Sequence, residues 1–537
     1  MALAVLNSCA LQGMSSAQVR TEVHIGAGLP NFLLVGLAST GVKESRDRVR
    51  AAILSSGFEF PVGRITVNLS PADLPKESGR FDLPIALGIL MATGQLRLSS
   101  NQYQCLLPRL YFVGELSLTG ALISSHNSLI LALSIFKSDS KAILIMPKAD
   151  AAMAALVEGL TVIGANSLRE VVEHLDGKRP IEASEANAYA DSGNRFLKTR
   201  ASDHDLFIEQ GLCLSDVRGQ PEACYLLELA ASGAHSILFS GPSGVGKTML
   251  AQRLPTILPD LSNLERLESL AIQSVSANGI VDLGTRPPYL FPHYSISDPA
   301  LLGGGAQAYP GEISLAHHGV LFLDELAEFK RVSLEALRGP LEAAEICISR
   351  SNSHQIYPAK FQLIAAANPC ACGYLDHPEA DCVCTHRAIN QYQSRISGPL
   401  LERIDIHYKV PPLQSSWMEA DAADSSSVVR QRVTVCRERQ LERQGVLNAH
   451  LKGRQVQEFC KLSQESKMRL ELKVQQKAWS ARVVQAILKL ARTSADMRGD
   501  RDIDAHDLEK AISCRQPFSK KEEGRLYWHE LRKTGNS

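Results

Sequence analysis

The stretch HSILFSGPSGVGKTMLAQRL, residues 235–254, decides the fold expected for the larger part of this 537-residue chain. It holds the full pattern G-x-x-x-x-G-K-[ST] between an apolar run typical of a strand and a run typical of a helix. In that setting the backbone N–H groups of a glycine-rich turn hold phosphates, Lys247 reaches the β- and γ-phosphates, and Thr248 ligates Mg²⁺. The pattern predicts an α/β domain that binds a nucleotide through Gly241, Pro242, Ser243, Gly244, Val245, Gly246, Lys247, Thr248 and Met249.

Two later apolar runs end in polar residues suited to the same site. GVLFLDEL, residues 319–326, reads as a buried strand that ends at Asp324 and Glu325. Asp324 is suited to the Mg²⁺ shell, and Glu325 to the base that polarises an attacking water. The run FQLIAA ends at Asn368, which is expected to sense the γ-phosphate from the tip of its strand. Carboxylates exposed at a strand end, without a catalytic role, are the simpler alternative for the first pair.

Two arginines extend the expected site. Arg403 in SGPLLERIDIH follows a helical turn and precedes a strand, and Arg482 in WSARVVQ comes early in a C-terminal helix. Charge on a phosphoryl group in transfer needs guanidinium donors, which a neighbouring subunit often supplies. Taken singly, either residue could equally be a surface arginine.

Four of the twelve cysteines fall within residues 368–384, NPCACGYLDHPEADCVC. If each Cys-x-Cys pair lies on an extended strand, its two thiols project to the same side. A loop between the pairs then predicts a closed structural zinc site from Cys370, Cys372, Cys382 and Cys384. Free buried thiols and a redox sensor are the alternatives, and His377 and His386 are possible substitute ligands.

Composition limits the class of protein. A chain with 45% hydrophobic and 21% charged residues, without a secretion signal or a membrane-spanning run, is expected to be cytoplasmic, and its thiols to be free or metal-bound. Net charge is zero, but from Arg430 onward 24 Lys and Arg face 14 Asp and Glu, a weak indication of a polyanionic partner. Polar breaks predict a domain at 1–176, a linker at 177–205, a core at 206–412 and a helical region at 413–537.

Longer motifs resemble a known family. RPPYLFPHYSISDPALLGGG (286–305), GVLFLDELAEF (319–329), FQLIAAANPCACGY (361–374) and RISGPLLERID (395–405) closely resemble the magnesium-chelatase-like AAA+ ATPases, in particular the bacterial YifB/ComM branch. In the N-terminal part, GLPNFLLVGL (28–37), VKESRDRVRAAILSSGFEFP (42–61) and ITVNLSPADLPKESGRFDLPIALGIL (65–90) match as well. The resemblance therefore spans nearly the whole chain.

The resemblance implies an α/β fold: a Lon-protease-like N-terminal domain, an AAA+ P-loop core with a parallel sheet, and a C-terminal helical lid. It implies Asn368 as sensor 1, Arg403 as arginine finger and Arg482 as sensor 2. It also implies a homohexamer with ATP and Mg²⁺, acting as a helicase on single-stranded and branched DNA. In the best characterised branch this activity promotes branch migration during natural transformation, with recombination proteins as further partners. A motor that remodels a partner protein, and a DNA-binding scaffold with a vestigial ATPase, are the alternatives.

Residues 345–365, EICISRSNSHQIYPAKFQLIA, read as a β-hairpin before the sensor strand. Arg350 and His354 are expected at its tip and Lys360 in its return arm, where six hairpins in a ring would form a track for DNA phosphates. A solvated hairpin without DNA contact is the alternative.

Peptidase activity is not expected of the N-terminal domain. Ser78 in PKESGRFDLPIAL does not align with a Lon-type catalytic serine, and the later strand region 114–133 holds no lysine to activate it. Asp82 is expected to be structural.

Overall fold

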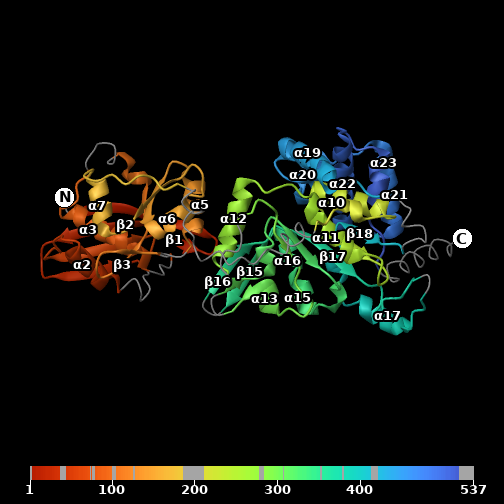
Figure 1. Ribbon diagram of the computed structural model, residues 1–537, viewed down its shortest axis with the longest axis horizontal. Helices are drawn as coiled ribbons and strands as arrows, with labels where there is room; N and C mark the ends of the chain where they lie inside the picture. The colour runs from red at the N-terminus through yellow and green to blue at the C-terminus, as the bar shows by residue number, and fades with distance from the viewer. Residues whose placement is uncertain are drawn as a thin grey trace. The chain divides into compact units, whose positions relative to one another are not determined.

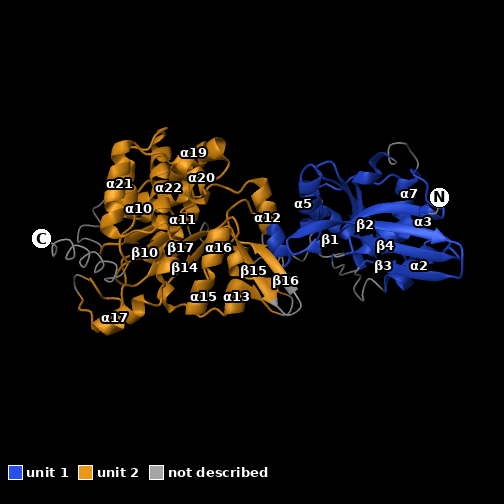
Figure 2. Cartoon of the chain, turned by 180° about the vertical axis from the view of Figure 1, so that it is seen from behind, with its two compact units in different colours: residues 1–198, 270–280 blue, residues 199–269, 281–537 orange. Residues whose placement is uncertain are grey.

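The structure is a computed structural model that describes residues 3–36, 44–72, 74, 79–98, 105–124, 127–185, 211–276, 284–305, 308–350, 353–377, 380–412 and 421–518. The side chains of Arg350, Ser353 and His354 lie outside that description, as does Ser78. The chain divides into two compact units, residues 1–198 with 270–280 and residues 199–269 with 281–537 (Figure 2). Among the described helices none is both long enough and apolar enough to span a bilayer.

Unit 1 is built on a mixed sheet with the strand order β3-β4-β2-β1-β5-β8-β9. β1 and β2 form an antiparallel hairpin, whereas β5, β8 and β9 continue the sheet in parallel. The strands of this unit are β1 (Leu3–Gln12), β2 (Ser15–Gly26), β3 (Asn31–Val35), β4 (Arg64–Ser70), β5 (Leu110–Phe112), β6 (Glu115–Leu116), β7 (Leu122–Ile123), β8 (Ile143–Pro147) and β9 (Thr161–Ala165). Its helices are α2 (Ser45–Ser55), α3 (Asp82–Ala92), α5 (Ser128–Ser138), α6 (Lys148–Ala154) and α7 (Leu168–Leu175).

Helix α3 is buried on nearly all sides because its sequence, DLPIALGILMA, has almost no polar face. At its start the fully buried Asp82 accepts hydrogen bonds from Arg48 of α2, at 2.7 and 3.2 Å, and from the N–H of Leu116. A buried carboxylate needs such partners, so Asp82 has the structural role expected of it.

Unit 2 is built on a five-stranded parallel sheet with the order β11-β14-β17-β10-β18. Its strands are β10 (Ile237–Ser240), β11 (Tyr289–Leu290), β12 (Gly303–Gly304), β13 (Tyr309–Pro310), β14 (Val320–Leu323), β15 (Glu345–Arg350), β16 (Ser353–Pro358), β17 (Gln362–Ala367) and β18 (Ile406–Lys409). Strands β10, β14 and β17 are buried at every residue, as their continuous apolar sequences predict for a covered parallel sheet.

The helices of unit 2 cover both faces of this sheet. They are α10 (Pro221–Gly233), α11 (Lys247–Ile257), α12 (Asn263–Ser274, whose last residues are grouped with unit 1), α13 (Asp298–Leu302), α14 (Glu312–Leu315), α15 (Arg331–Ala336), α16 (Arg338–Ala343), α17 (His386–Gln393), α18 (Gly398–Leu401), α19 (Ser426–Gln444), α20 (Arg454–Phe459), α21 (Gln464–Lys477), α22 (Ala481–Arg498) and α23 (Ala505–Ser513). In Figure 1, α10, α19 and α22 lie on one side of the sheet, and α13 and α15 on the other. One hydrophobic core joins the sheet to the C-terminal helices.

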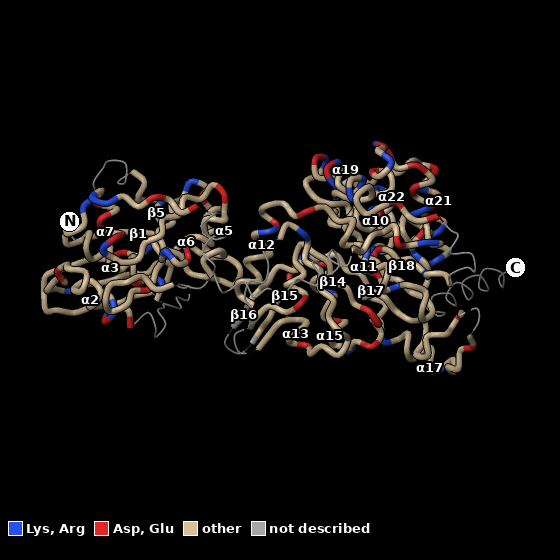
Figure 3. Tube along the Cα trace, in the orientation of Figure 1, with Lys and Arg blue, Asp and Glu red and all other residues tan. Residues whose placement is uncertain are grey.

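Several arginines of the C-terminal helices are paired with carboxylates where the structure describes them. Arg432 pairs with Glu228, and Arg443 and Arg492 pair with the buried Asp496. Figure 3 accordingly shows basic and acidic residues interleaved over α19 to α23 rather than a stripe of one sign. The described part of this region therefore supports the solvated helical surface over a polyanion site.

Candidate functional site: a nucleotide site at one edge of the sheet

The carboxyl ends of β10, β14 and β17 bring the predicted nucleotide residues to one edge of the sheet. Ser240 of β10 lies opposite Ala367 of β17, so the glycine-rich turn and Asn368 start side by side. Leu323 of β14 pairs with Ala365 of β17, which brings Asp324 to this edge too. Ligands of parallel α/β sheets bind at this edge.

In the glycine-rich turn, Lys247 bonds to backbone carbonyls of the turn itself. Gly241, Gly244 and Gly246 have positive φ angles of 155°, 84° and 91°, which residues with a side chain adopt only at a cost. The Lys247 ammonium donates to the carbonyl oxygens of Gly241 at 2.8 Å and Pro242 at 2.6 Å. Burial lowers the pKa of Lys247 to about 8, against the opposing effect of the nearby Asp324 and Glu325 carboxylates.

Thr248 and Asp324 are already joined, as a shared Mg²⁺ site requires. The Thr248 hydroxyl donates to an Asp324 carboxylate oxygen at 2.6 Å. Hydroxyl and carboxylate oxygens are the ligands that Mg²⁺ takes together with phosphate oxygens, so these two residues fit the ion. Glu325, next to them, has a left-handed backbone with φ of 52°, its N–H bonded to Asp324 and its side chain exposed. Such strain in a residue with a side chain is typical of functional positions. Met249, in the first turn of α11, is half-buried.

Arg403 and Arg482 meet at the opposite edge of the sheet. Arg403 comes just before β18, where its carbonyl accepts from Ser236, the residue before β10. The four residues of β10 span about 13 Å between that point and the glycine-rich turn. At this amino end of the strands, Arg403 donates to one carboxylate oxygen of Glu342 at 2.7 Å and Arg482 donates to the other at 2.9 Å. The two arginines are thus brought together with each other, and not with Lys247 of the same chain.

A cavity of about 770 Å³ lies beside this pair and is called the amino-edge cavity here. Its charged lining is formed by Lys360, Arg403, Lys452, Arg482 and Lys489 against Glu342, Glu402 and Asp405. The cavity therefore offers more cations than carboxylates, which suits an anionic group. Glu342 was not predictable from the sequence, because a glutamate in PLEAAE is typical of an ordinary helix surface.

The predicted β-hairpin is confirmed, with one residue placed differently. β15 and β16 pair antiparallel from Glu345 with Pro358 to Arg350 with Ser353. The side chains of Arg350 and His354 lie outside the described residues. Lys360 is not in the return arm: it follows the end of β16 by two residues and lines the amino-edge cavity. The strand ends at Pro358, the Ala359 N–H still donates to the Ala344 carbonyl at 2.8 Å, and the backbone of Lys360 then bonds to His317 and His318.

His317 and His318 form a structural network with Glu268. Their ligand atoms and a Glu268 carboxylate oxygen are close enough together for a metal ion. However, the Lys360 N–H donates to His317 Nδ1 at 3.0 Å, and burial lowers the pKa of His317, so the neutral ring carries its proton on Nε2. That nitrogen faces Glu268 at 3.7 Å and has no lone pair for a metal. The pair is therefore structural.

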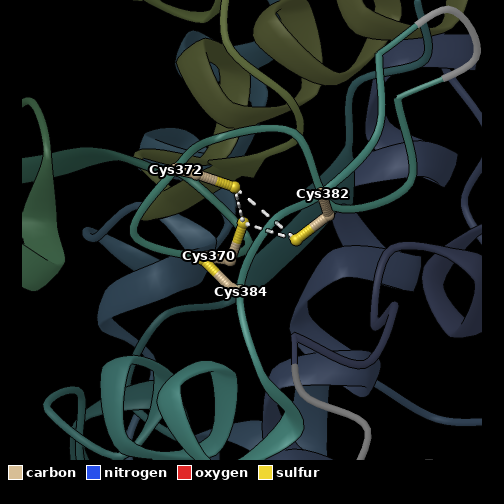
Figure 4. A group of neighbouring side chains, drawn as sticks. All are labelled: Cys370, Cys372, Cys382 and Cys384. Atoms are coloured by element: carbon tan, nitrogen blue, oxygen red, sulfur yellow. Dashed lines mark hydrogen bonds between the residues drawn. The ribbon is translucent and has the colours of Figure 1, made fainter.

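The four cysteines predicted as zinc ligands come together (Figure 4). The sulfur atoms of Cys370, Cys372 and Cys382 lie 3.3 to 3.7 Å apart, and the sulfur of Cys384 belongs to the same group within 4.8 Å. Tetrahedral zinc with bonds of about 2.3 Å would place its sulfurs about 3.8 Å apart, so the donor set fits. Neither His377 nor His386 belongs to this group.

The expected strand geometry of the cysteine pairs is wrong. Cys370 and Cys372 lie in a turn, closed by a hydrogen bond from the Gly373 N–H to the Cys370 carbonyl at 3.0 Å. Gly373, the last residue of this turn, takes a φ of 81°, in the left-handed region that favours glycine. Cys382 and Cys384 precede α17 in irregular backbone.

Comparisons with known proteins agree along the chain. Models described as "Subunit ChlI of Mg-chelatase", "Magnesium chelatase, subunit ChlI" and "Magnesium chelatase, subunit ChlI C-terminal" match residues 21–150, 213–418 and 423–515. The chain is 42% identical to "Uncharacterized protein YifB" of Escherichia coli over 96% of this chain and 97% of that one. It is 41% identical to "Competence protein ComM" of Haemophilus influenzae over 96% and 98%. A Mycobacterium bovis protein, Mb2921c, is 38% identical over 96% and 99%. The chain therefore belongs to the YifB/ComM family of magnesium-chelatase-like proteins.

Proposed function

We propose that this chain is a Mg²⁺-dependent ATPase of the AAA+ type that works as a ring, with each nucleotide site completed by the next subunit. One observation carries the proposal: Lys247, Thr248 and Asp324 lie at the carboxyl edge of the sheet, and Arg403 and Arg482 lie at its amino edge. Two edges of one sheet meet when identical subunits associate head to tail, and such contacts close into rings. We infer that the ring is a homohexamer, as in the resembling family.

The residues divide the chemistry between them. Lys247 exchanges its carbonyl partners for β- and γ-phosphate oxygens, and Thr248 and Asp324 hold the Mg²⁺ that neutralises phosphate charge when bound. Glu325 takes the proton of the attacking water, and Asn368 orients that water toward the γ-phosphate. Arg403 and Arg482 of the neighbouring subunit stabilise the negative charge on the phosphoryl group in transfer.

We further propose that the ring is a helicase that moves single-stranded and branched DNA and promotes branch migration during natural transformation. The relative named a competence protein and the confirmed hairpin β15–β16 support this. In a ring the hairpins would face the channel, with Arg350 and His354 toward the phosphates. Recombination proteins are the expected partners, and the cytoplasm the expected compartment.

The test measures ATP hydrolysis with and without forked DNA, together with displacement of a labelled strand. Stimulation by DNA and displacement that both vanish in Glu325→Gln are expected. An assembled ring that hydrolyses ATP at the same rate with and without DNA and displaces no strand would refute the helicase.

A motor that remodels a partner protein is the second candidate, because all three matching models describe a magnesium chelatase subunit. It predicts a stable, ATP-dependent complex with a protein from the same cell and no effect of DNA on hydrolysis. Co-purification in Glu325→Gln, which would hold ATP without cleaving it, distinguishes the two.

The four cysteines are proposed to hold a structural Zn²⁺ ion. Cys370, Cys372, Cys382 and Cys384 supply a closed set of thiolates, and the N–H of Leu375 donates to the Cys370 sulfur at 3.4 Å, a contact that stabilises a metal-bound thiolate. The expected result is one zinc per chain in the purified protein, lost in Cys382→Ser. An equal zinc content in that variant would refute the assignment.

For residues 1–176 we propose a Lon-protease-like fold without peptidase activity, followed by a linker at 177–205, the ATPase core at 206–412 and a helical lid at 413–537. Limited proteolysis tests the boundaries: cleavage is expected first within 177–205.

A further inference from the structure

The loop that carries the cysteines touches the phosphate-binding turn directly. The N–H of Ser243, the third residue of that turn, donates to the carbonyl oxygen of Gly373 at 3.0 Å. Ser243 precedes the residues from Gly244 to Thr248, whose N–H groups are the ones that face phosphates in such turns. The contact therefore fixes the turn from outside without using a phosphate donor.

The position of Gly373 depends in turn on the cysteines. It follows Cys372 directly, and its own N–H bonds to the Cys370 carbonyl. A Cβ atom at Gly373 would lie 3.3 Å from the Cβ of Ser243, so the two loops are as close as a glycine permits. Whatever holds Cys370 and Cys372 in place also places the carbonyl that receives Ser243.

The same loop is tied to the sensor strand and to α17. Asn368 is two residues before Cys370, and the carbonyl of Pro369 between them accepts from the Gln393 amide of α17 at 2.9 Å. Cys384 is followed by Thr385, the residue whose hydroxyl caps α17. Cys370 and Cys384, the first and last cysteines, thus border the sensor and the helix.

We propose that the cysteine cluster is a clamp on the phosphate-binding turn: zinc on the four thiolates fixes Gly373, Gly373 fixes Ser243, and loss of the metal weakens ATP binding. The inference rests on the ATP site and the zinc site proposed above. It makes Gly373 a positioning residue, and it predicts a change in ATP affinity rather than in the rate of a saturated ring, because Gly373 is bonded to the turn and not to Glu325.

The decisive variant is Gly373→Ala, which keeps all four cysteines. The readouts are zinc content, melting temperature and the affinity for a fluorescent, non-hydrolysable ATP analogue. We expect one zinc per chain and an affinity about tenfold lower, the equivalent of one lost hydrogen bond. Gly445→Ala is the matched control, because Gly445 also has a left-handed φ, of 73°, while nothing lies within 4 Å of its added Cβ. An affinity in Gly373→Ala equal to that of the control would overturn the clamp.

Zinc removal from the unaltered chain gives a second measurement, which decides the matter if Gly373→Ala fails to fold. A chelator in the presence of a thiol reductant should lower the affinity for the analogue about tenfold, and added zinc should restore it. Unchanged affinity after removal, or a purified chain without zinc, would overturn the clamp. A zinc-loaded chain that binds no ATP analogue would instead refute the proposed function.

Discussion

Two inactive variants should restore each other's activity when mixed, because in the proposed ring each nucleotide site takes its arginines from a neighbour. Glu325→Gln removes the base and leaves Arg403, whereas Arg403→Ala removes the arginine and leaves the base. An arginine finger contributes about 10³-fold or more to turnover, so each variant alone should be nearly inactive. The distance across the sheet, about 13 Å along β10, excludes rescue within one chain.

The size of the recovery follows from the head-to-tail arrangement. In rings formed at random from equal amounts of the two variants, about one interface in four joins an intact base to an intact arginine. Turnover should therefore rise from near zero to about a quarter of that of the unaltered chain, in a steady-state assay of phosphate release after the variants have exchanged subunits.

Two controls make the result specific. Arg403→Ala mixed with the double variant Glu325→Gln/Arg403→Ala offers no Arg403 at any interface and should stay inactive. Arg469→Ala, which removes an exposed arginine that pairs with Glu465 on its own helix, should keep full turnover. A mixture no more active than its two components measured separately would refute the completion of the site by a neighbour.

Three further results are expected. The pKa of Lys247 is lowered to about 8, and phosphates favour the charged ammonium, so ATP binding above pH 8 takes up a proton. The dissociation constant for ATP should therefore rise about tenfold per pH unit above pH 8. Calorimetry across pH 6.5 to 9.5 measures this, and a dissociation constant that does not change with pH would contradict it. Asn368→Ala should lower single-turnover hydrolysis about 10²-fold and leave ATP affinity nearly unchanged, whereas an equal loss in both would make the residue part of binding. Arg350→Ala should reduce the stimulation of ATP hydrolysis by DNA, whereas Lys360→Ala should not, because Lys360 lines the amino-edge cavity. An equal loss of stimulation in both variants would show that Lys360 also contacts DNA.

The sequence predicted the nucleotide edge well because local pattern and global fold agree there. The apolar runs before Gly241, Asp324 and Asn368 are all buried strands, and parallel pairing brings their carboxyl ends together without any further information. The relation between Arg403 and Arg482 was not predictable in this way. It depends on how α22 packs against α10 and α19, and side-chain packing across 79 positions leaves no local pattern.

Two other features, the hairpin β1–β2 and the turn at the cysteines, were not predicted from the sequence. The hairpin β1–β2 was missed because residues 3–12 mix apolar and small polar side chains, and its strands are specified by pairing with each other across the turn at Gly13. The cysteine turn was expected to be extended, because the alternation in Cys-x-Cys is compatible with a strand. Instead, a hydrogen bond from the Gly373 N–H to the Cys370 carbonyl closes a turn, and the glycine directly after the second cysteine was the cue in the sequence.

Glu342 holds the guanidinium of Arg403, which lies just before β18, and that of Arg482 from α22, although its own side chain is 56% exposed. Each such ion pair in solvent is worth about 1 kcal/mol or less, so the carboxylate is a weak ligand that a phosphate of higher charge can displace. In the isolated subunit the Glu342 carboxylate thus holds both arginines in place until a phosphate displaces it. Since Glu342 links Arg482 of α22 to Arg403, just before β18, that exchange removes one polar link between the C-terminal helices and the sheet, while the shared hydrophobic core still holds them together.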